Sequence, residues 1–402
     1  MDLPRARTPA GPALADLSRL DVAIPQAAAA LARRLALVGF HRDYVQALTA
    51  QLPGLPAHLQ TSGLAWLTLD DEQPAALALR LLVLNQSLSA AQLGRLFGDA
   101  LTAELTAAGL LLPHKAQWRF PLHLELVNQL MVVSDPQGDD PATVMAVGGS
   151  TQLLAAACYP QADIERALDL GCGSGTIALL LAAACREVVA SDINPRALQL
   201  ARFNAALNGV HNVDWRLGDL FEPVAGETFD LIVAQPPFLP QPASAPRVLY
   251  LHGGPRGDEL ALALLAQAPR YLSRTGLAVV LSDFPVLDEP LARRLRACLP
   301  DTGLMLLHAE QAVAAATHVT LYGCASTRGA ARESLALHRH LQALGVNEIQ
   351  HAVVVLHRGG GTLTVTVENA LWGGLQRSDI DRLLAERSSL EQPTVPTPLS
   401  QG

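Results

Sequence analysis

A glycine-rich loop with an acid at its front is the strongest chemical signal in this sequence. It follows a short apolar segment, opens a helical one and runs Asp169-Leu170-Gly171-Cys172-Gly173-Ser174-Gly175. Glycines at Gly171, Gly173 and Gly175 let the backbone turn tightly and come close to a ligand, which side chains would block. An acid in front of such a loop repels a pyrophosphate but can pair with an ammonium group. The loop is therefore the first part of a candidate cofactor site.

Two further acids end the next two predicted strands. Asp192 lies 192 − 169 = 23 positions after the acid of the loop, where a carboxylate can accept hydrogen bonds from both hydroxyls of a ribose. Asp219 closes a third strand, where a carboxylate can accept a hydrogen bond from an adenine amino group. Ile193 and Leu220 follow these acids and complete the candidate cofactor residues. Because a dinucleotide needs a G-x-G-x-x-G loop to bring its pyrophosphate to a helix N-terminus, the set favours S-adenosylmethionine over NAD.

A rigid proline turn, Gln235-Pro236-Pro237-Phe238, directly follows the fourth predicted strand. Two prolines cannot continue a central parallel strand, so the chain leaves the sheet at its carboxyl end, where open α/β sheets bind ligands. The turn aims the Gln235 carboxamide and the Pro236 carbonyl at one point, and Phe238 offers a face on which a planar group can stack. These three residues are candidate catalytic residues.

A base is needed only if the reacting group is a hydroxyl or an ammonium. His252, in the loop after the proline turn, has an ordinary pKa in the right range for a base, and Tyr250 and Asp258 lie near it in the sequence. Arg247 and Arg256 could bind a carboxylate or phosphate of a substrate, with solvated surface charge as the open alternative. The other polar candidates are expected to be structural: His318, His351, His357 and Arg358. None of them shows metal-ligand spacing, so no metal is predicted.

The composition combines many apolar residues with few charged ones. Half of the 402 residues are apolar, only 16% are charged, and the mean hydropathy is +0.23. The longest uninterrupted apolar run, Ile177 to Cys185, is about half of the roughly 20 residues that a membrane span needs. The N-terminal residues lack the apolar core of a secretory signal, and the five cysteines form no CxxC pair. These features predict a cytoplasmic protein with reduced cysteines and no membrane partner.

The charge balance argues against a nucleic-acid partner. The formal net charge is −8, and Lys115 is the only lysine. Nucleic-acid-binding proteins normally carry a basic surface. We therefore expect the partner to be a small-molecule or a peptide/protein acceptor, with RNA or DNA ranked behind both.

Strands and helices alternate in the second half of the chain. Seven predicted strands lie between residues 163 and 325, a pattern typical of βαβ units and a parallel sheet. The last of these strands is expected at residues 318–325. Two further strands, at 351–358 and 362–369, are expected to form a hairpin in the tail. The predicted fold class is α/β with a Rossmann-like sheet.

The region before the sheet predicts helices followed by a hairpin at about residues 74–135, which is the order of a winged helix. A winged helix can bind DNA, but the candidate recognition helix, 99–112, contains no Lys or Arg. We therefore expect this module to position a substrate or to pack as a lid. The predicted divisions are a flexible lead-in 1–24, a helical/winged-helix substrate domain 25–138, a sheet domain 139–326, a C-terminal helix-and-hairpin extension 327–391 and a disordered tail 392–402.

The loop DLGCGSG, the acids Asp192 and Asp219 and the QPPF turn together resemble the class I S-adenosylmethionine-dependent methyltransferases. The resemblance is to the small-domain group with an Asn-Pro-Pro-aromatic motif, which includes release-factor glutamine N5-methyltransferases and rRNA guanine N2-methyltransferases. It covers about residues 140–325 and implies a Rossmann-like seven-stranded methyltransferase sheet with an N-terminal helical/winged-helix domain. The segments VGGSTQLLAAA (147–157) and YLHGGPRGDEL (250–260) are similar to bacterial members with such an N-terminal domain.

The resemblance also implies a role for each motif residue. Gln235 and Pro236 would accept the two N–H bonds of a planar nitrogen, and Phe238 would stack on its face. The cofactor contacts would be Asp169 and Gly171 near the methionine part, Asp192 on the ribose and Asp219 near the adenine.

Gln235 stands where the motif has asparagine, which adds one methylene of reach and one torsion to fix. Either the acceptor nitrogen lies farther out or a different acceptor is used. The predicted function is S-adenosylmethionine-dependent N-methylation of a small-molecule or peptide/protein acceptor. Two alternatives stay open: a winged-helix regulator that binds S-adenosylmethionine without turnover, and an rRNA base N-methyltransferase.

Overall fold

A computed structural model describes most of the chain, namely residues 14–17, 20–56, 59–136, 140–160, 164–242, 248–322 and 328–391. Most of the predicted lead-in, the whole predicted tail 392–402 and the candidate Arg247 lie outside the described residues. The first helix begins at Leu20, five positions before residue 25, where the predicted helical domain starts (25 − 20 = 5). No helix in the described ranges is both long and apolar enough to cross a membrane.

The N-terminal part consists of short helices followed by two small hairpins. The turn of the second hairpin lies at Asn128, whose positive φ of 53° allows the chain to reverse there. Ser89 caps its helix through a reciprocal capping box with Gln92, and Gly98 interrupts that helix with a φ of 73°. The elements are α1 (Leu20–Leu37), α2 (Arg42–Thr49), α3 (Gln60–Leu67), α4 (Pro74–Ala78) with a π-helical continuation (Leu79–Val83), α5 (Ala90–Ala107), β1 (Leu112–His114), β2 (Gln117–Arg119), β3 (His123–Val127) and β4 (Leu130–Ser134).

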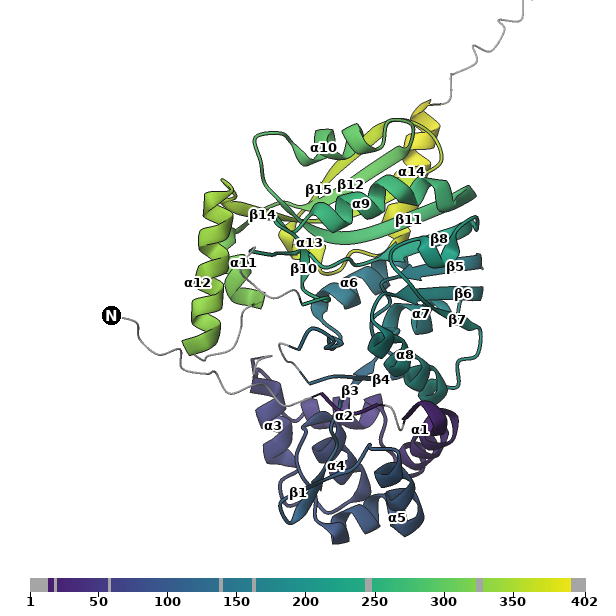
Figure 1. Cartoon of the computed structure of the whole chain (residues 1–402), viewed down its shortest axis with the longest axis vertical. Helices are drawn as coiled ribbons and strands as arrows, with labels where there is room; N and C mark the ends of the chain where they lie inside the picture. Colours follow the sequence, from purple (N-terminus) through teal and green to yellow (C-terminus); the bar gives the residue numbers. More distant parts are fainter. Residues whose placement is uncertain are drawn as a thin grey trace, which may run out of the picture.

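A large, mainly parallel sheet forms the other part of the molecule (Figure 1). Its strand order is β15-β12-β14-β11-β8-β5-β6-β7, and β14 runs antiparallel to both of its neighbours. The α/β Rossmann-like class is therefore confirmed. The strands are β5 (Ile164–Leu170), β6 (Cys185–Asp192), β7 (Val213–Leu217), β8 (Phe229–Ala234), β11 (Leu272–Pro285), β12 (Gly303–Ala309), β14 (Glu348–His357) and β15 (Thr362–Val367), with the short β13 (Val313–Ala314) beside β14.

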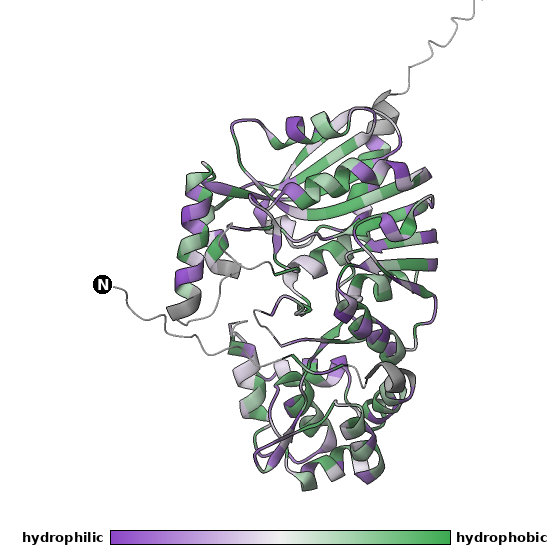
Figure 2. Cartoon of the chain, in the orientation of Figure 1, coloured by the Kyte–Doolittle hydropathy of each residue, from purple (hydrophilic) through white to green (hydrophobic). Residues whose placement is uncertain are grey.

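Helices cover both faces of this sheet, which explains the apolar composition. One face packs against α6 (Gly149–Cys158), α7 (Thr176–Leu181) and α14 (Arg377–Glu391). The other packs against α9 (Glu259–Gln267) and α10 (Leu291–Cys298). Because both faces are buried, the strands are continuous apolar runs, and most of their length is hydrophobic in Figure 2.

Two strand predictions are wrong. Residues 318–322 of the predicted seventh strand belong to α11 (Ala315–Tyr322), and its last three residues, 323–325, lie outside the described residues. Ala315 and Val319, four positions apart, share one helical face and pack with Leu341 of α12 (Arg328–Ala343). The tail strands do not form a hairpin either, because β12 lies between β14 and β15. The large sheet therefore includes two strands, β14 and β15, that come after the predicted division at residue 326.

The two parts of the molecule share one core across α8 (Pro195–Asn208), whose residues Ala197, Leu200, Phe203 and Leu207 pack with the N-terminal helices. Fully buried Asn204 accepts a hydrogen bond from the N–H of Val133 in β4 and donates to the carbonyl of the same residue. It also donates to the carbonyl of Ser174 in the glycine loop, at 2.9 Å. The strand pair β3–β4 is therefore fixed directly to the candidate cofactor site.

Candidate functional site

The glycine loop forms one wall of a cavity of about 240 Å³ at the carboxyl ends of β5, β6 and β8. Gly171 and Gly173 have φ values of 75° and 54°, and no heavy atom lies within 4 Å of where a Cβ would stand. The space beside both residues is open, so a ligand can approach the backbone. Gly175 instead permits close packing where α7 begins, because a Cβ there would come within 2.9 Å of Trp215.

Two buried acids stand behind this loop. Asp169 is 3% exposed, and its Oδ2 accepts a hydrogen bond from the Ala178 N–H at 2.9 Å. Burial, with the nearby Asp192 carboxylate, raises the pKa of Asp169 to about 7. Asp192 accepts hydrogen bonds from the N–H groups of Gly173 and Asn194, each at 2.8 Å, and burial raises its pKa as well. Both acids line the cavity.

The predicted adenine side lies at the rim of the same cavity. Asp219 is exposed, and Leu220 beside it adopts a φ of 45°, a backbone conformation that an L-residue rarely takes. Ile193 is 46% exposed although it is apolar. All three residues line the cavity, so the structure brings together every predicted cofactor residue except Gly175.

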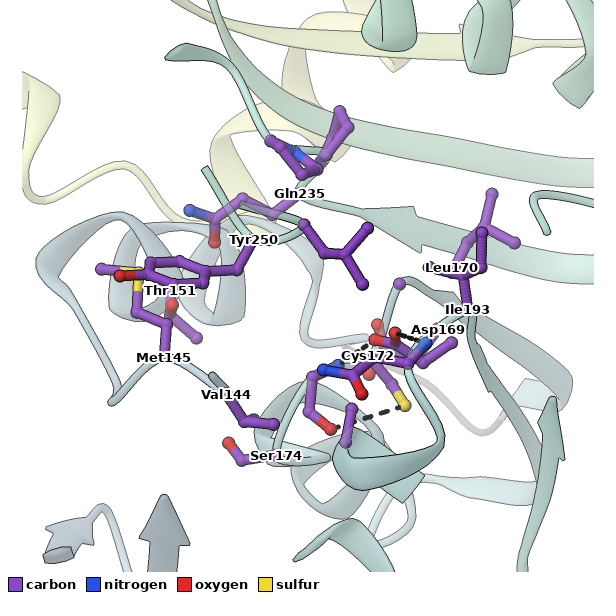
Figure 3. Close-up of a pocket in the computed structure, with 18 of the residues that line it drawn as sticks. Val144, Met145, Thr151, Asp169, Leu170, Cys172, Ser174, Ile193, Gln235 and Tyr250 are labelled. Atoms are coloured by element: carbon purple, nitrogen blue, oxygen red, sulfur yellow. Dashed lines mark hydrogen bonds between the residues drawn. The ribbon is translucent and has the colours of Figure 1, made fainter. Parts of the chain in front are cut away.

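The proline turn closes the opposite side of the cavity. Gln235 and Tyr250 lie on one side of it and Asp169 and Cys172 on the other (Figure 3). The Gln235 Nε2 donates a hydrogen bond to Ser150 Oγ at 2.7 Å. This bond fixes the extra torsion that glutamine has over asparagine and leaves Oε1 as the acceptor end of the carboxamide. Ser150 lies in the segment 147–157. The likeness of this segment to a family segment is the only indication of the contact that the sequence offers.

Gly253 and Gly257, in the loop after the proline turn, pack against the backbone of the turn, and we call these two residues the glycine clamp. A Cβ at Gly253 would collide with the carbonyl oxygen of Pro237, and one at Gly257 would collide with that of Phe238. The strands β9 (Leu239–Pro240) and β10 (His252–Gly254) pair beside these contacts. The HGGPRG sequence therefore has a physical reason, because only glycine permits the loop to lie against the turn.

Tyr250 lines the cofactor cavity, whereas the candidate base His252 lies outside its lining. The Nδ1 of His252 accepts a hydrogen bond from the Val248 N–H at 3.0 Å, and this residue does not line the cavity. Asp258 is fully buried in an ion pair with Arg294. Arg256 pairs with Asp258 and with Glu259, so its charge is already compensated.

A cluster of polar side chains that includes two of the histidines expected to be structural lies beside Phe238. The Asp283 carboxylate, near the end of β11, hydrogen-bonds His351 Nδ1 and lies 3.5 Å from His318 Nδ1. The ring of His318 is 6.2 Å from that of Phe238, and burial lowers the pKa of His318 to about 4. The described residues contain no group of three or more His, Cys, Asp or Glu side chains that could hold a metal ion.

Comparison with known proteins agrees with this geometry. Residues 146–298 match the family model of the methyltransferase small domain. A ribosomal protein uL3 glutamine methyltransferase of Bordetella pertussis is 38% identical over 129 residues, 29% of this chain and 43% of that protein. A release factor glutamine methyltransferase of Xylella fastidiosa is 35% identical over 180 residues, 40% of this chain and 61% of that protein. A release factor glutamine methyltransferase of Deinococcus radiodurans is 41% identical over 141 residues, 33% of this chain and 50% of that protein.

The sheet and its acid-fronted glycine loop define a class I methyltransferase architecture. Residues 146–298 are similar in sequence to the methyltransferase small domain of that class. The cofactor of this class is S-adenosylmethionine. The chain spans between 43% and 61% of the length of the curated relatives that it matches here.

Proposed function

We propose that this protein is an S-adenosylmethionine-dependent N-methyltransferase acting on a carboxamide nitrogen. The observation that carries the proposal is the meeting of the glycine loop with the Gln235-Pro236-Pro237-Phe238 turn in one cavity. The matched relatives are named as glutamine methyltransferases of ribosomal protein uL3 and of release factors. A glutamine side chain in a protein or peptide, or a carboxamide in a small molecule, is the corresponding acceptor.

The cavity suits the cofactor in charge and shape. Asp169 at the front of the loop would pair with the ammonium of the methionine part, and Asp192 would accept from the ribose hydroxyls. Asp219 at the rim would accept from the adenine amino group, where exposed Ile193 and Leu220 offer apolar cover to a planar base. When bound, the cofactor supplies a methyl group on a positively charged sulfur, which a nitrogen lone pair can attack.

The residues of the turn would prepare that nitrogen. An amide nitrogen is a poor nucleophile because its lone pair is delocalised into the carbonyl. Gln235 Oε1 and the Pro236 carbonyl would accept its two N–H bonds, and Phe238 would stack on its face. Ser150 would act through Gln235 by holding its Nε2. Alignment in a site shielded from water would supply much of the rate.

Two further assignments belong to this proposal. The N-terminal part would act on the acceptor side, because β3 and β4 are bonded to the cofactor domain and part of their turn lines a neighbouring cavity. A cytoplasmic location fits Cys158, Cys172 and Cys185, which are buried free thiols of the kind kept reduced inside cells.

Incubation with methyl-labelled S-adenosylmethionine and a cell extract tests the proposal. The extract is then separated into protein, nucleic acid and small molecules. Label in protein or in a small molecule, as an amide N-methyl group, supports the proposal. Label confined to nucleic acid, or NAD binding in place of S-adenosylmethionine binding, contradicts it.

A further inference from the structure

A second cavity, of about 910 Å³, adjoins the site of the proposed reaction. It shares Ser150 and Phe238 with the cofactor cavity. Much of its lining comes from α6, with further residues from α2 and the β3–β4 turn in the N-terminal part, from β11 and β14 in the sheet, and from residues 372–376. Figure 1 shows where these elements lie. Because Phe238 is the proposed stacking residue, the remainder of an acceptor would extend into this second cavity.

The sheet side of the second cavity presents an oriented histidine. His351 and Asp283 are directly opposite each other on β14 and β11. The Asp283 carboxylate is buried and holds the Nδ1 end of the ring, while the His351 side chain is 25% exposed and lines the cavity. The ring nitrogen that Asp283 does not hold, Nε2, is therefore the one available to a ligand.

The charges of this cluster favour a donor at His351. The hydrogen bond to Asp283 raises the pKa of His351, which favours the imidazolium with an N–H at both ring nitrogens. His318 from α11, also next to Asp283, has its pKa lowered to about 4 by burial and stays neutral near pH 7. Of the two rings beside Asp283, His351 is therefore the one whose protonation the site favours.

The N-terminal part contributes a second donor. Arg42, at the start of α2, lines the cavity, and no carboxylate of the described residues forms an ion pair with it. Besides Arg42, the lining contains the paired side chains of Asp283 and His351. The other polar lining side chains carry amide or hydroxyl groups: Asn128, Ser150, Gln152, Tyr159, Ser282 and Gln376.

We propose that the second cavity binds a carboxylate of the methyl acceptor through His351 and Arg42, which makes His351 a specificity-determining residue and Asp283 its positioning residue. A carboxylate is an acceptor that can take hydrogen bonds from the guanidinium N–H groups of Arg42 and from the Nε2–H of His351. The inference rests on the proposed function, because that function assigns the second cavity to the methyl acceptor. Binding of a carboxylate can nevertheless be measured without methyl transfer.

The test uses glutarate and glutaramide, which have the same chain length and differ in carboxylate against carboxamide. Each is titrated into the full-length protein, with and without S-adenosylhomocysteine, while NMR follows the histidine ring signals. We expect glutarate to bind at least tenfold more tightly than glutaramide and to raise the pKa of His351. Equal affinity for the two compounds, or a His351 pKa that glutarate leaves unchanged, overturns the inference.

Three variants identify the residues involved. Arg42→Gln, on a short helix of the N-terminal part, and His351→Gln should each weaken glutarate binding at least tenfold. His357→Gln, at the far end of the same strand, is the matched control and should bind glutarate as the wild type does. Wild-type affinity in Arg42→Gln refutes the role of Arg42 even if a histidine variant fails to fold. Methyl transfer without selective glutarate binding refutes this inference alone, whereas glutarate binding without methyl transfer refutes the proposed function alone.

Discussion

Asp169 is the residue whose ionisation should govern cofactor binding. Its pKa of about 7 in the folded protein lies above the ordinary value of 3.8. If its carboxylate pairs with the cofactor ammonium, affinity should rise about tenfold between pH 6 and pH 8 as Asp169 loses its proton. Calorimetric titration with S-adenosylmethionine across this range measures the effect.

The Asp169→Asn variant is the control for that titration. It should bind the cofactor weakly at every pH and lose most of the pH dependence. Because the folded state holds the Asp169 proton more tightly than the unfolded state does, Asp169 should also make the free energy of unfolding fall as pH rises from about 4 to about 7. An affinity that is constant from pH 6 to pH 8 would show that Asp169 does not pair with the ammonium.

Ser150 should affect catalysis only through Gln235. Its Oγ accepts the hydrogen bond that orients the Gln235 carboxamide, and losing one such bond costs about 1–1.5 kcal/mol, close to tenfold in rate. We expect Ser150→Ala to lower kcat by about tenfold and to leave the Kd for S-adenosylmethionine unchanged.

A double-mutant cycle separates this role from a general loss of structure. If Ser150 acts through Gln235, adding Ser150→Ala to Gln235→Ala should cost nothing further. Additive losses of kcat would mean that Ser150 contributes to the reaction independently of Gln235.

Among single residues, those that belong to a recognisable sequence motif could be predicted. Asp169, Asp192 and Gln235 follow strands and carry recognisable spacings, so they could be assigned in advance. Ser150 and Asp283 could not, because each matters only through a partner that folding brings close, Gln235 and His351 respectively. A lone serine or aspartate carries no signal of such a contact.

At the scale of elements, we expect catalysis to be most sensitive to substitutions in the glycine clamp. Gly253→Ala would place a Cβ against the Pro237 carbonyl, which must then move together with the rest of the proline turn. Because displacement of about 1 Å at a reacting centre can cost about 100-fold in rate, we expect kcat to fall by at least that factor while cofactor affinity is retained. Steady-state kinetics and calorimetry on the same preparation measure both.

Gly360 provides the matched control, since it lies in the loop between β14 and β15 and has no heavy atom within 4 Å of its Cβ position. Gly360→Ala should keep wild-type turnover. Full activity in Gly253→Ala would mean that the close approach of the two loops has no catalytic consequence.

The strands β5, β6, β7, β8, β11 and β12 could be predicted because each is a separate segment between turn signals. Their lateral order could not, since the sequence does not state which strands pair. The hairpin predicted for the tail rested on adjacency along the chain, whereas β14 inserts between β11 and β12. Residues 318–325 contain β-branched and aromatic residues typical of strands, yet packing of Ala315 and Val319 against α12 favours the helix.

For the whole molecule, the contact between its two parts should be coupled to cofactor binding. Asn204 and Asn208 both pair with backbone groups of β4, but only Asn204 also donates to Ser174 of the glycine loop. Asn204→Ala leaves buried backbone groups without partners, which should lower the free energy of unfolding by about 2–4 kcal/mol. It should also weaken S-adenosylmethionine binding severalfold.

Asn208→Ala is the comparison variant, because it removes the bonds to Met131 without touching the glycine loop. It should lower the free energy of unfolding in urea but keep the cofactor affinity of the wild type. Equal losses of affinity in both variants would show that the effect comes from general loosening of α8 and not from the glycine loop.

The proposed function depends above all on Gln235 taking part in methyl transfer and not in cofactor binding. The decisive experiment measures label transfer from methyl-labelled S-adenosylmethionine and the Kd for the cofactor in the same samples of wild-type protein and Gln235→Ala. We predict that the variant loses detectable transfer and binds the cofactor within about twofold of the wild type, because Gln235 binds Ser150 and faces the cavity from the turn, opposite the glycine loop. Undiminished transfer by Gln235→Ala, or loss of cofactor binding in parallel with transfer, would contradict this role of Gln235.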